Sequence, residues 1–216
     1  MHKSPEQFEQ ATLKLFKIWS FIYDSFLPRL LYFNSVYGKT IDAIVQYDAP
    51  LHAPQSRFLD AACGTGEILL RLSSRYPHTQ FAGIDFSRHM LEKAAAKTRM
   101  CKNVTLKQAN IRYLPYPNCS FDMALCSDAL HHFADPSGAL RELARVVKPH
   151  GTLILTDPVC DTLLQSCMLE IFVKPWDRPK KYYATHEVSL LLHAAGFHPT
   201  KILTHHMTSF FIAERE

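Results

Sequence analysis

The chain has 216 residues, of which 47% are hydrophobic and 20% charged. This length suits one domain with a sizeable buried core, and the composition excludes an intrinsically disordered chain. The formal net charge is only +4, the Lys and Arg residues are scattered, and the densest basic cluster is Arg178-Pro-Lys-Lys181. This distribution argues against an extended nucleic-acid-binding face, since such a face usually carries a stronger basic stripe.

Cysteine spacing and the N-terminus indicate where the chain resides. The six cysteines form no C-x-x-C pair, which favours free thiols in a reducing compartment. The first residues lack a basic region followed by an apolar run, so no signal peptide is expected. No apolar stretch reaches the roughly 18 residues that a membrane span requires. We expect a soluble, cytoplasmic protein with a single domain over residues 1–216.

The first fifty residues have helical patterns. A helix is predicted over residues 5–23, where a capping serine and a first-turn proline precede apolar residues near helical spacing. A second amphipathic segment covers residues 36–47. The two prolines within residues 49–54 predict a linker. Residues 1–50 are expected to form a helical cap.

Short apolar runs then alternate with helical segments. The predicted strands are 58–62, 81–84, 104–107, 121–126 and 152–155, and the predicted helices are 67–75, 87–98, 136–147 and 185–195. This alternation predicts a mostly parallel sheet with helices on both faces. The last two runs, 201–204 and 208–213, are joined only by residues 205–207. So short a link makes an antiparallel hairpin and cannot make a parallel crossover.

A glycine-rich turn follows the first predicted strand. Gly64 and Gly66 would let the backbone approach a nucleotide-type ligand closely. A dinucleotide fingerprint needs a third glycine where Leu69 stands, and the Glu67 carboxylate beside a pyrophosphate would be unfavourable. Asp85 ends the second strand, where a carboxylate can accept hydrogen bonds from both ribose hydroxyls. For Asp85 taken alone, a turn or helix-capping role is the alternative.

The stretch Asp60-Ala-Ala-Cys-Gly-Thr-Gly66 resembles the first motif of class I S-adenosylmethionine-dependent methyltransferases, D/E-x-G-x-G-x-G, with Ala62 in place of the first glycine. Further matching segments follow in the family's order, at 83–90, 108–110, 114–122 and 143–151. The whole pattern is most similar to the small-molecule methyltransferases of ubiquinone and menaquinone biosynthesis. The resemblance implies an α/β, Rossmann-like, doubly wound sheet that is seven-stranded and mostly parallel. Its last strand would be antiparallel, and helices would precede it.

The same resemblance implies S-adenosyl-L-methionine as the cofactor and S-adenosyl-L-homocysteine as the product. By position, the cofactor-binding residues would be Tyr23, Ala61, Ala62, Cys63, Gly64, Gly66, Asp85, Phe86, Met90, Asn110, Ile111 and Ser127. Asp85 would hold the ribose, and Phe86 and Met90 would pack on the adenine. Tyr23 belongs to a Tyr-Asp element found before the core in many relatives, and packing against the domain is an equal alternative for it.

Methyl transfer from a sulfonium is an in-line displacement, in which the protein mainly aligns the partners and excludes water. A general base is needed only where the acceptor atom keeps its proton at neutral pH. His131 and His132 follow the fourth strand at the ligand-binding edge of such sheets, so they are the candidates. A structural or pocket-lining role is the alternative, because a His-His-Phe run is frequent in the broader family. No third ligand accompanies the adjacent histidines, so no metal site is expected.

The segment 158–183 leaves the fifth strand at its carboxyl end and is expected to lie over the pocket. Its aromatic residues could grip a flat or apolar acceptor, or pack against the first helices: Phe172, Trp176, Tyr182 and Tyr183. With residues 55–157 as the cofactor-binding core and 184–216 as a closing helix and strands, no separate substrate domain remains. We therefore expect a small-molecule acceptor.

Two other functions stay open from the sequence. One is a catalytically inactive S-adenosylmethionine-binding partner subunit. The other is a methyltransferase acting on RNA or protein. The chain lacks an Asn/Asp-Pro-Pro-Tyr type sequence after the fourth strand, which argues against methylation of the amino groups of bases or glutamine.

Overall fold

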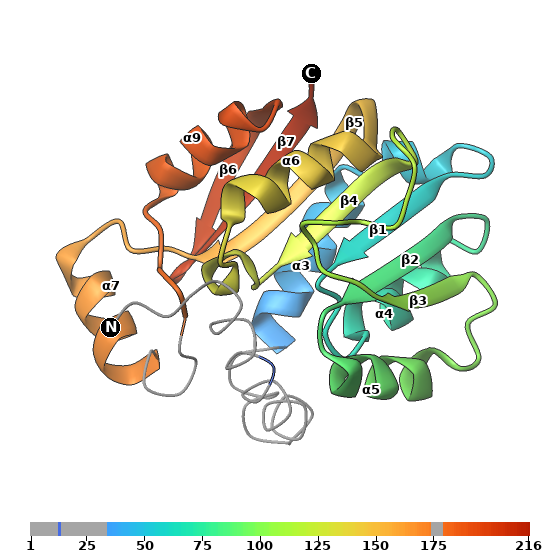
Figure 1. The fold of residues 1–216 in the computed structure, drawn as a ribbon, viewed down its shortest axis with the longest axis horizontal. Helices are drawn as coiled ribbons and strands as arrows, with labels where there is room; N and C mark the ends of the chain where they lie inside the picture. The colour runs from blue at the N-terminus through green and yellow to red at the C-terminus, as the bar shows by residue number, and fades with distance from the viewer. Residues whose placement is uncertain (1–12, 14–33, 174–178) are drawn as a thin grey trace.

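A computed structural model describes residue 13 and residues 34–173 and 179–216 (Figure 1). The strands are β1 (Arg57–Ala61), β2 (Gln80–Asp85), β3 (Val104–Gln108), β4 (Phe121–Ser127), β5 (Val147–Pro158), β6 (Phe197–His205) and β7 (Thr208–Arg215). The α-helices are α3 (Asn34–Gln46), α4 (Glu67–Arg75), α5 (Arg88–Thr98), α6 (Pro136–Val146), α7 (Leu163–Met168) and α9 (Thr185–Ala194). Short helical turns are η2 (Ala49–His52), η3 (Leu130–His132) and η4 (Leu169–Val173).

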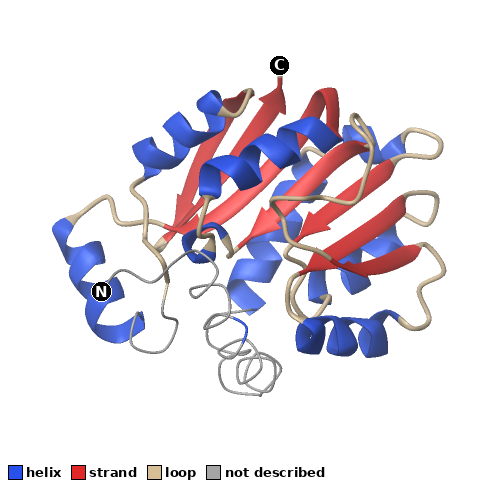
Figure 2. Ribbon diagram, in the orientation of Figure 1, coloured by secondary structure: helices blue, strands red, loops and turns tan. Residues whose placement is uncertain are grey.

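The strands form one sheet with the order β3-β2-β1-β4-β5-β7-β6. The pairs from β3 to β5 are parallel, whereas β7 runs antiparallel to both β5 and β6. The predicted seven-stranded, mostly parallel sheet with an antiparallel last strand is therefore confirmed. The predicted terminal hairpin is confirmed as well, and Figure 2 shows it at one edge of the sheet.

Helices cover both faces of this sheet, and the strands alternate between two apolar clusters. On β1, Phe58 packs in the cluster that contains residues of α3 and α4, whereas Leu59 packs in the cluster that contains residues of α6 and α9. On β4, Met123 and Ala124 divide in the same way. This period of two is the consequence of successive side chains pointing to opposite sides of a strand.

Two segments differ from their predicted form. The prolines of residues 49–54 predicted a linker, but Pro50 occupies the first turn of the short helix η2, where its missing N–H costs nothing. The predicted strand 152–155 extends over Val147–Pro158, because β7 pairs with β5 along residues 152–158. Neither difference changes the topology.

The parallel strands set the position of the site. Because β1, β2, β3, β4 and β5 run in the same direction, their carboxyl ends meet at one edge of the sheet. The segments that leave these ends are 62–66, 86–87, 109–114, 128–135 and 159–162. Among the described residues, no helix has both the length and the apolarity needed to cross a membrane.

Candidate functional site: a pocket at the carboxyl edge of the sheet

A pocket opens at this edge of the sheet. Most of its lining follows the ends of β1, β2, β3 and β4, and the rest comes from α3, α4 and α5. The lining residues are Tyr37, Asp60, Ala62, Cys63, Gly64, Glu67, Ile68, Ile84, Asp85, Phe86, Met90, Ala109, Asn110, Ile111, Arg112, Ser127, Asp128, Ala129, His132, Phe133, Ala134 and Asp135.

The turn after β1 is held in a left-handed backbone conformation. The amides of Ala62 and Cys63 both donate to the Ile84 carbonyl, at 2.9 and 2.8 Å. Ala62, Gly64 and Gly66 have φ values of +73°, +51° and +76°. Glycine adopts such values without steric cost, so Ala62 keeps a conformation that a side chain makes unfavourable. This explains physically why the family's motif carries glycine where this chain has Ala62.

Gly66 has a packing role instead of lining the pocket. A Cβ added to it would lie 2.9 Å from the Cβ of Ala94, on α5. The absence of a side chain therefore lets the start of α4 approach α5. Close approach between elements is one of the functions of glycine in nucleotide-binding turns.

Asp85 connects the first two turns of the site. Its Oδ2 accepts a hydrogen bond from the Gly64 amide at 2.9 Å, and its Oδ1 accepts one from the Ser87 amide at 2.7 Å. Burial raises the pKa of Asp85 to about 6, while the hydrogen bonds from these amides oppose the rise. Each carboxylate oxygen has a second lone pair, so the group can still accept two further hydrogen bonds from a ligand.

Asp60 is a second buried carboxyl in the pocket lining. It lies at the end of β1 and is 2% exposed. Burial raises its pKa to about 8, and the nearby charge of Asp85 adds to the rise. Burial and the same two carboxyl groups also raise the pKa of the Cys63 thiol. The pocket thus carries two acidic groups whose ionisation a cationic ligand would favour.

The lining is acidic as a whole. Its carboxylates are Asp60, Glu67, Asp85, Asp128 and Asp135, whereas Arg112 supplies its guanidinium. Glu67 has its own cationic partners outside the lining, because Arg71 and Lys97 lie 2.8 and 3.4 Å from its carboxylate oxygens. Even without Glu67, the acidic residues of the lining outnumber the basic ones. Such a surface favours a cation and disfavours an anion.

The loop after β4 separates the two candidate histidines. His132 is 7% exposed and lines the pocket, whereas His131 is 2% exposed and is not part of the lining. Nδ1 of His131 lies 2.9 Å from Oδ1 of Asp157, at the end of β5. The rings of the two histidines are 4.1 Å apart. His132 is therefore the histidine that can meet a ligand directly.

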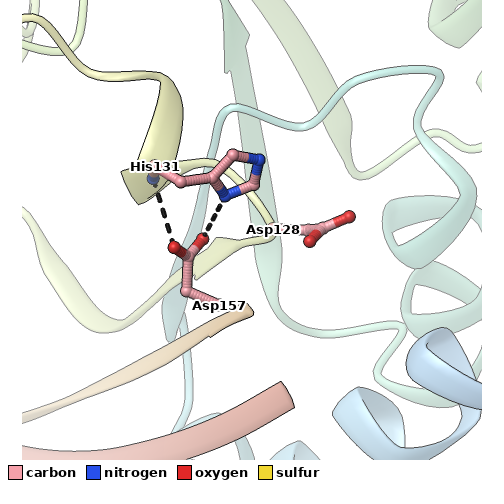
Figure 3. A group of neighbouring side chains, drawn as sticks. All are labelled: Asp128, His131 and Asp157. Carbon is pink, nitrogen blue, oxygen red and sulfur yellow. Dashed lines mark hydrogen bonds and ion pairs between the residues drawn. The ribbon is translucent and has the colours of Figure 1, made fainter. Parts of the chain in front are cut away.

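Asp128, His131 and Asp157 also bring possible metal-ligand atoms within 4.8 Å of one another (Figure 3). Sequence reasoning found no third ligand beside the histidine pairs, because Asp157 lies on β5, 26 residues from His131 in the chain. The Asp157 oxygens already accept hydrogen bonds from the Leu130 and His131 amides, in addition to the contact with the His131 ring. Hydrogen bonding accounts for this arrangement, and it gives no reason to add a metal.

The structure divides the predicted site residues into three groups. Those that line the pocket are Ala62, Cys63, Gly64, Asp85, Phe86, Met90, Asn110, Ile111, Ser127 and His132. Those that lie behind or beside the lining are Ala61, Gly66, His131, Tyr182 and Tyr183. Tyr23, Trp176 and the side chain of Phe172 lie outside the described residues. The roles assigned to all of these residues remain predictions.

The two tyrosines of the predicted acceptor side are both buried. Tyr183 packs in the apolar cluster with residues of α6 and α9, and it forms a β-bridge with Val159. The ring of Tyr182 lies 5.5 Å from that of His131. These contacts tie the returning segment to the chain beside β5 and to the loop after β4.

Sequence reasoning missed several lining residues. Tyr37 reaches the pocket from α3, and Asp128, Phe133 and Asp135 reach it from the loop after β4. The pattern of residues 36–47 predicts an amphipathic helix but not which edge of the sheet it covers. The position of the loop after β4, directly behind a predicted strand end, was the available signal for the other three residues.

The chain matches the family described as "Methyltransferase domain" over residues 52–202. This range contains the glycine turn, Asp85 and the loop after β4. The chain belongs to the methyltransferase-domain family. The membership confirms the predicted resemblance to class I S-adenosylmethionine-dependent methyltransferases.

Among curated proteins, the chain is 32% identical over 141 residues to a demethylmenaquinone methyltransferase of Deinococcus radiodurans, covering 63% of this chain and 58% of that protein. It is 38% identical over 106 residues to the uncharacterized methyltransferase YcgJ of Bacillus subtilis, covering 48% of this chain and 41% of that protein. The chain thus spans about half the length of the curated relatives it matches.

Solved structures agree on the fold. A Thermotoga maritima protein, described as an S-adenosylmethionine-dependent methyltransferase and possible histamine N-methyltransferase, has a TM-score of 0.73 at 20% identity, covering 95% of this chain and 100% of that chain. The [4+2]-cyclase SpnF has a TM-score of 0.69 at 20% identity, covering 83% of this chain and 80% of that chain. Identities this low show the fold and leave the reaction open.

Proposed function

We propose that this protein transfers the methyl group of S-adenosylmethionine to a small-molecule acceptor by in-line displacement. The observation that carries the proposal is the pocket itself. It joins a buried strand-end carboxylate, Asp85, to an acidic lining beside a histidine that a second ligand could reach. When bound, the cofactor supplies a methyl group on a positively charged sulfur.

The residues of the pocket fit this cofactor in three places. Asp85 has lone pairs available for two ribose hydroxyls, beyond the bonds that it accepts from Gly64 and Ser87. Phe86, Met90 and Ile111 offer apolar surface to a purine ring. Asp60 offers a buried carboxyl to the ammonium group of the methionine part, which would favour the ionised form of that carboxyl.

The charge of the lining supports this cofactor over a dinucleotide. A sulfonium and an ammonium gain from carboxylates, whereas a pyrophosphate would lie beside the carboxylates of Asp85 and Asp135. The same argument disfavours an RNA acceptor, because a phosphate backbone is attracted by basic surfaces. The curated relative named as a demethylmenaquinone methyltransferase gives further support to a small, uncharged acceptor.

On the acceptor side, the protein would align the acceptor and exclude water. His132 would face the acceptor from the loop after β4, and its imidazole could take up a proton where the acceptor atom releases one. Tyr37 and Phe133 would bound the same space from α3 and from the loop.

Labelled methyl transfer tests the proposal. The protein is incubated with S-adenosylmethionine carrying a labelled methyl group and with a cell extract divided into small-molecule, RNA and protein fractions. We expect label in the small-molecule fraction, and no label there with the Asp85→Ala variant. Label confined to RNA or protein would overturn the small-molecule assignment.

A second candidate is a protein that binds the cofactor without transferring its methyl group. The favouring observation is that a [4+2]-cyclase shares the fold with a TM-score of 0.69. Thermal-shift titration with S-adenosylmethionine, S-adenosylhomocysteine and NAD separates the cases, because a ligand of the native state raises the unfolding temperature. Stabilisation by the first two ligands without label in any fraction would favour this candidate.

A further inference from the structure

Asp157 is buried completely, and its partners lie on one short segment. Its Oδ1 accepts from the Leu130 amide at 3.1 Å and lies 2.9 Å from Nδ1 of His131, while its Oδ2 accepts from the His131 amide at 3.2 Å. All of these donors belong to η3, which follows β4, whereas Asp157 lies on β5 (Figure 3). One carboxylate therefore fixes the conformation of the loop between β4 and α6.

His131 also contacts a third segment, the chain that returns toward α9. Its carbonyl accepts hydrogen bonds from the amides of Lys180 and Lys181, at 2.7 and 3.3 Å. Its ring packs against Tyr182 at 5.5 Å between centroids. The end of β5, the loop after β4 and the chain returning toward α9 thus meet at this one histidine.

The loop held in this way forms a large part of the pocket wall. Ser127, Asp128, Ala129 and residues 132–135 all line the pocket, so this wall sits directly on the segment that Asp157 holds. Asp128 adopts a φ of +53°, and its amide donates to the Thr156 carbonyl at 2.7 Å, so β5 also holds the beginning of this loop beside Asp157. Without the carboxylate, two buried amides would lose their acceptor, and such a loss favours a rearranged loop.

We propose that Asp157 is a positioning residue for the acceptor side of the pocket, and that it acts through His131. The inference rests on the proposed methyl transfer for its effect on rate. The side chain of His131 links its loop to Asp157. The loop held in this way places His132, the next residue, at the pocket where a ligand can reach it. A carboxylate has no proton to give, so the contact with His131 requires hydrogen on Nδ1.

The test compares Asp157→Asn with Asp122→Asn. Asp122 also accepts a backbone amide, from Arg57 at 2.9 Å, but it lies at the beginning of β4, away from the pocket lining. Amide hydrogen exchange of Leu130 and His131 and the ¹⁵N shifts of the His131 ring are measured without any acceptor. The affinity for S-adenosylmethionine is measured by calorimetry.

For Asp157→Asn we expect at least tenfold faster exchange at the Leu130 amide, because an amino group that faces Nδ1 of His131 replaces the oxygen that accepts from Leu130. The His131 ring should leave the Nδ1–H form, since the asparagine amino group can donate to Nδ1. Affinity for S-adenosylmethionine should change less than threefold, because the predicted cofactor residues lie mainly after β1 and β2. Methyl transfer should slow about 10- to 100-fold, as for other groups that orient a functional ligand. Asp122→Asn should show none of these changes.

Replacement of His131 provides the second test, which does not depend on the folding of Asp157→Asn. His131→Asn keeps an N–H near the position of Nδ1, so it should retain amide protection at Leu130 and most of the transfer rate. His131→Leu should lose both. If His131→Asn lost methyl transfer but kept amide protection at Leu130, the positioning role of His131 would be overturned. His131 would then be assigned as the general base.

Unchanged exchange and ring shifts in Asp157→Asn would also overturn the inference. These two measurements need no methyl transfer. A failure of the proposed function would leave them unaffected, so the two failures can be distinguished.

Discussion

The two sides of the pocket are built in different ways. On the side formed after β1 and β2, the carboxyl that accepts the amides of Gly64 and Ser87 belongs to Asp85, which itself lines the pocket. On the side formed after β4 and β5, the carboxylate of Asp157 lies outside the lining and holds a loop from the neighbouring strand, and a third segment packs on that loop. The first side presents its carboxyl to a ligand, whereas the second presents a loop that a carboxylate behind it holds. Variants on the first side should change cofactor binding, and variants on the second should change transfer.

Asp85→Ala should give the largest effect. The dissociation constant for S-adenosylmethionine should rise at least about 100-fold, since two hydrogen bonds to a charged group contribute roughly 1.5–3 kcal/mol each. Calorimetry at pH 7.5 measures the change, with Asp122→Ala as the control for loss of a carboxylate outside the pocket. An affinity within threefold of the unmodified protein would remove Asp85 from the cofactor site.

His132→Gln should slow methyl transfer while leaving the binding of S-adenosylmethionine nearly unchanged. The affinity for S-adenosylmethionine should stay within about threefold, whereas transfer to an acceptor whose reacting atom holds a proton should fall roughly 100-fold. Single-turnover rates and calorimetry on the same preparation provide the two values. Equal losses in affinity and in transfer rate would place His132 on the cofactor side of the pocket. The two sides would then not differ in the way described above.

Asp60 makes stability depend on pH. The pKa of its carboxyl in the folded chain is about 8, against an ordinary value of 3.8. Between these pH values the folded chain keeps a proton that the unfolded chain releases, so the free energy of unfolding falls as the pH rises. Asp60→Asn should therefore raise the free energy of unfolding at pH 8 by about 1–3 kcal/mol.

Urea denaturation of the ligand-free protein at pH 4 and pH 8 measures this change. The gain from Asp60→Asn should be small at pH 4, where the carboxyl is protonated in the folded chain. An equal gain at both pH values would show that ionisation of Asp60 is not its source.

Ala62→Gly should give the smallest effect. Relief of the left-handed backbone at φ +73° should stabilise the folded chain by about 1 kcal/mol, after allowance for the greater freedom of glycine in the unfolded chain. Ala61→Gly is the matched control, because Ala61 lies within β1 without a positive φ and should lose about 1 kcal/mol. Thermal unfolding of both variants provides the comparison, and a loss in both would contradict the strain at Ala62.

Sequence patterns predicted most of the fold, because each pattern depends on nearby residues. The short apolar runs of β1 and β4 and the short link between β6 and β7 are local properties. The extent of β5 was underestimated, because its length depends on pairing with β7, which follows some fifty residues later in the chain. Pairing between distant strands is not visible in a local pattern.

The predicted site shows the same division. The sequence by itself determined the glycine turn, the position of Asp85 at the end of the second strand and the family, because these features depend on fixed spacing within single strand–turn–helix units. Only the tertiary structure decided that His132 lines the pocket while His131 contacts Asp157. It also placed Tyr37 in the pocket and Gly66 against Ala94. These outcomes depend on which distant strands and helices become neighbours, and that is settled by packing of the whole sheet.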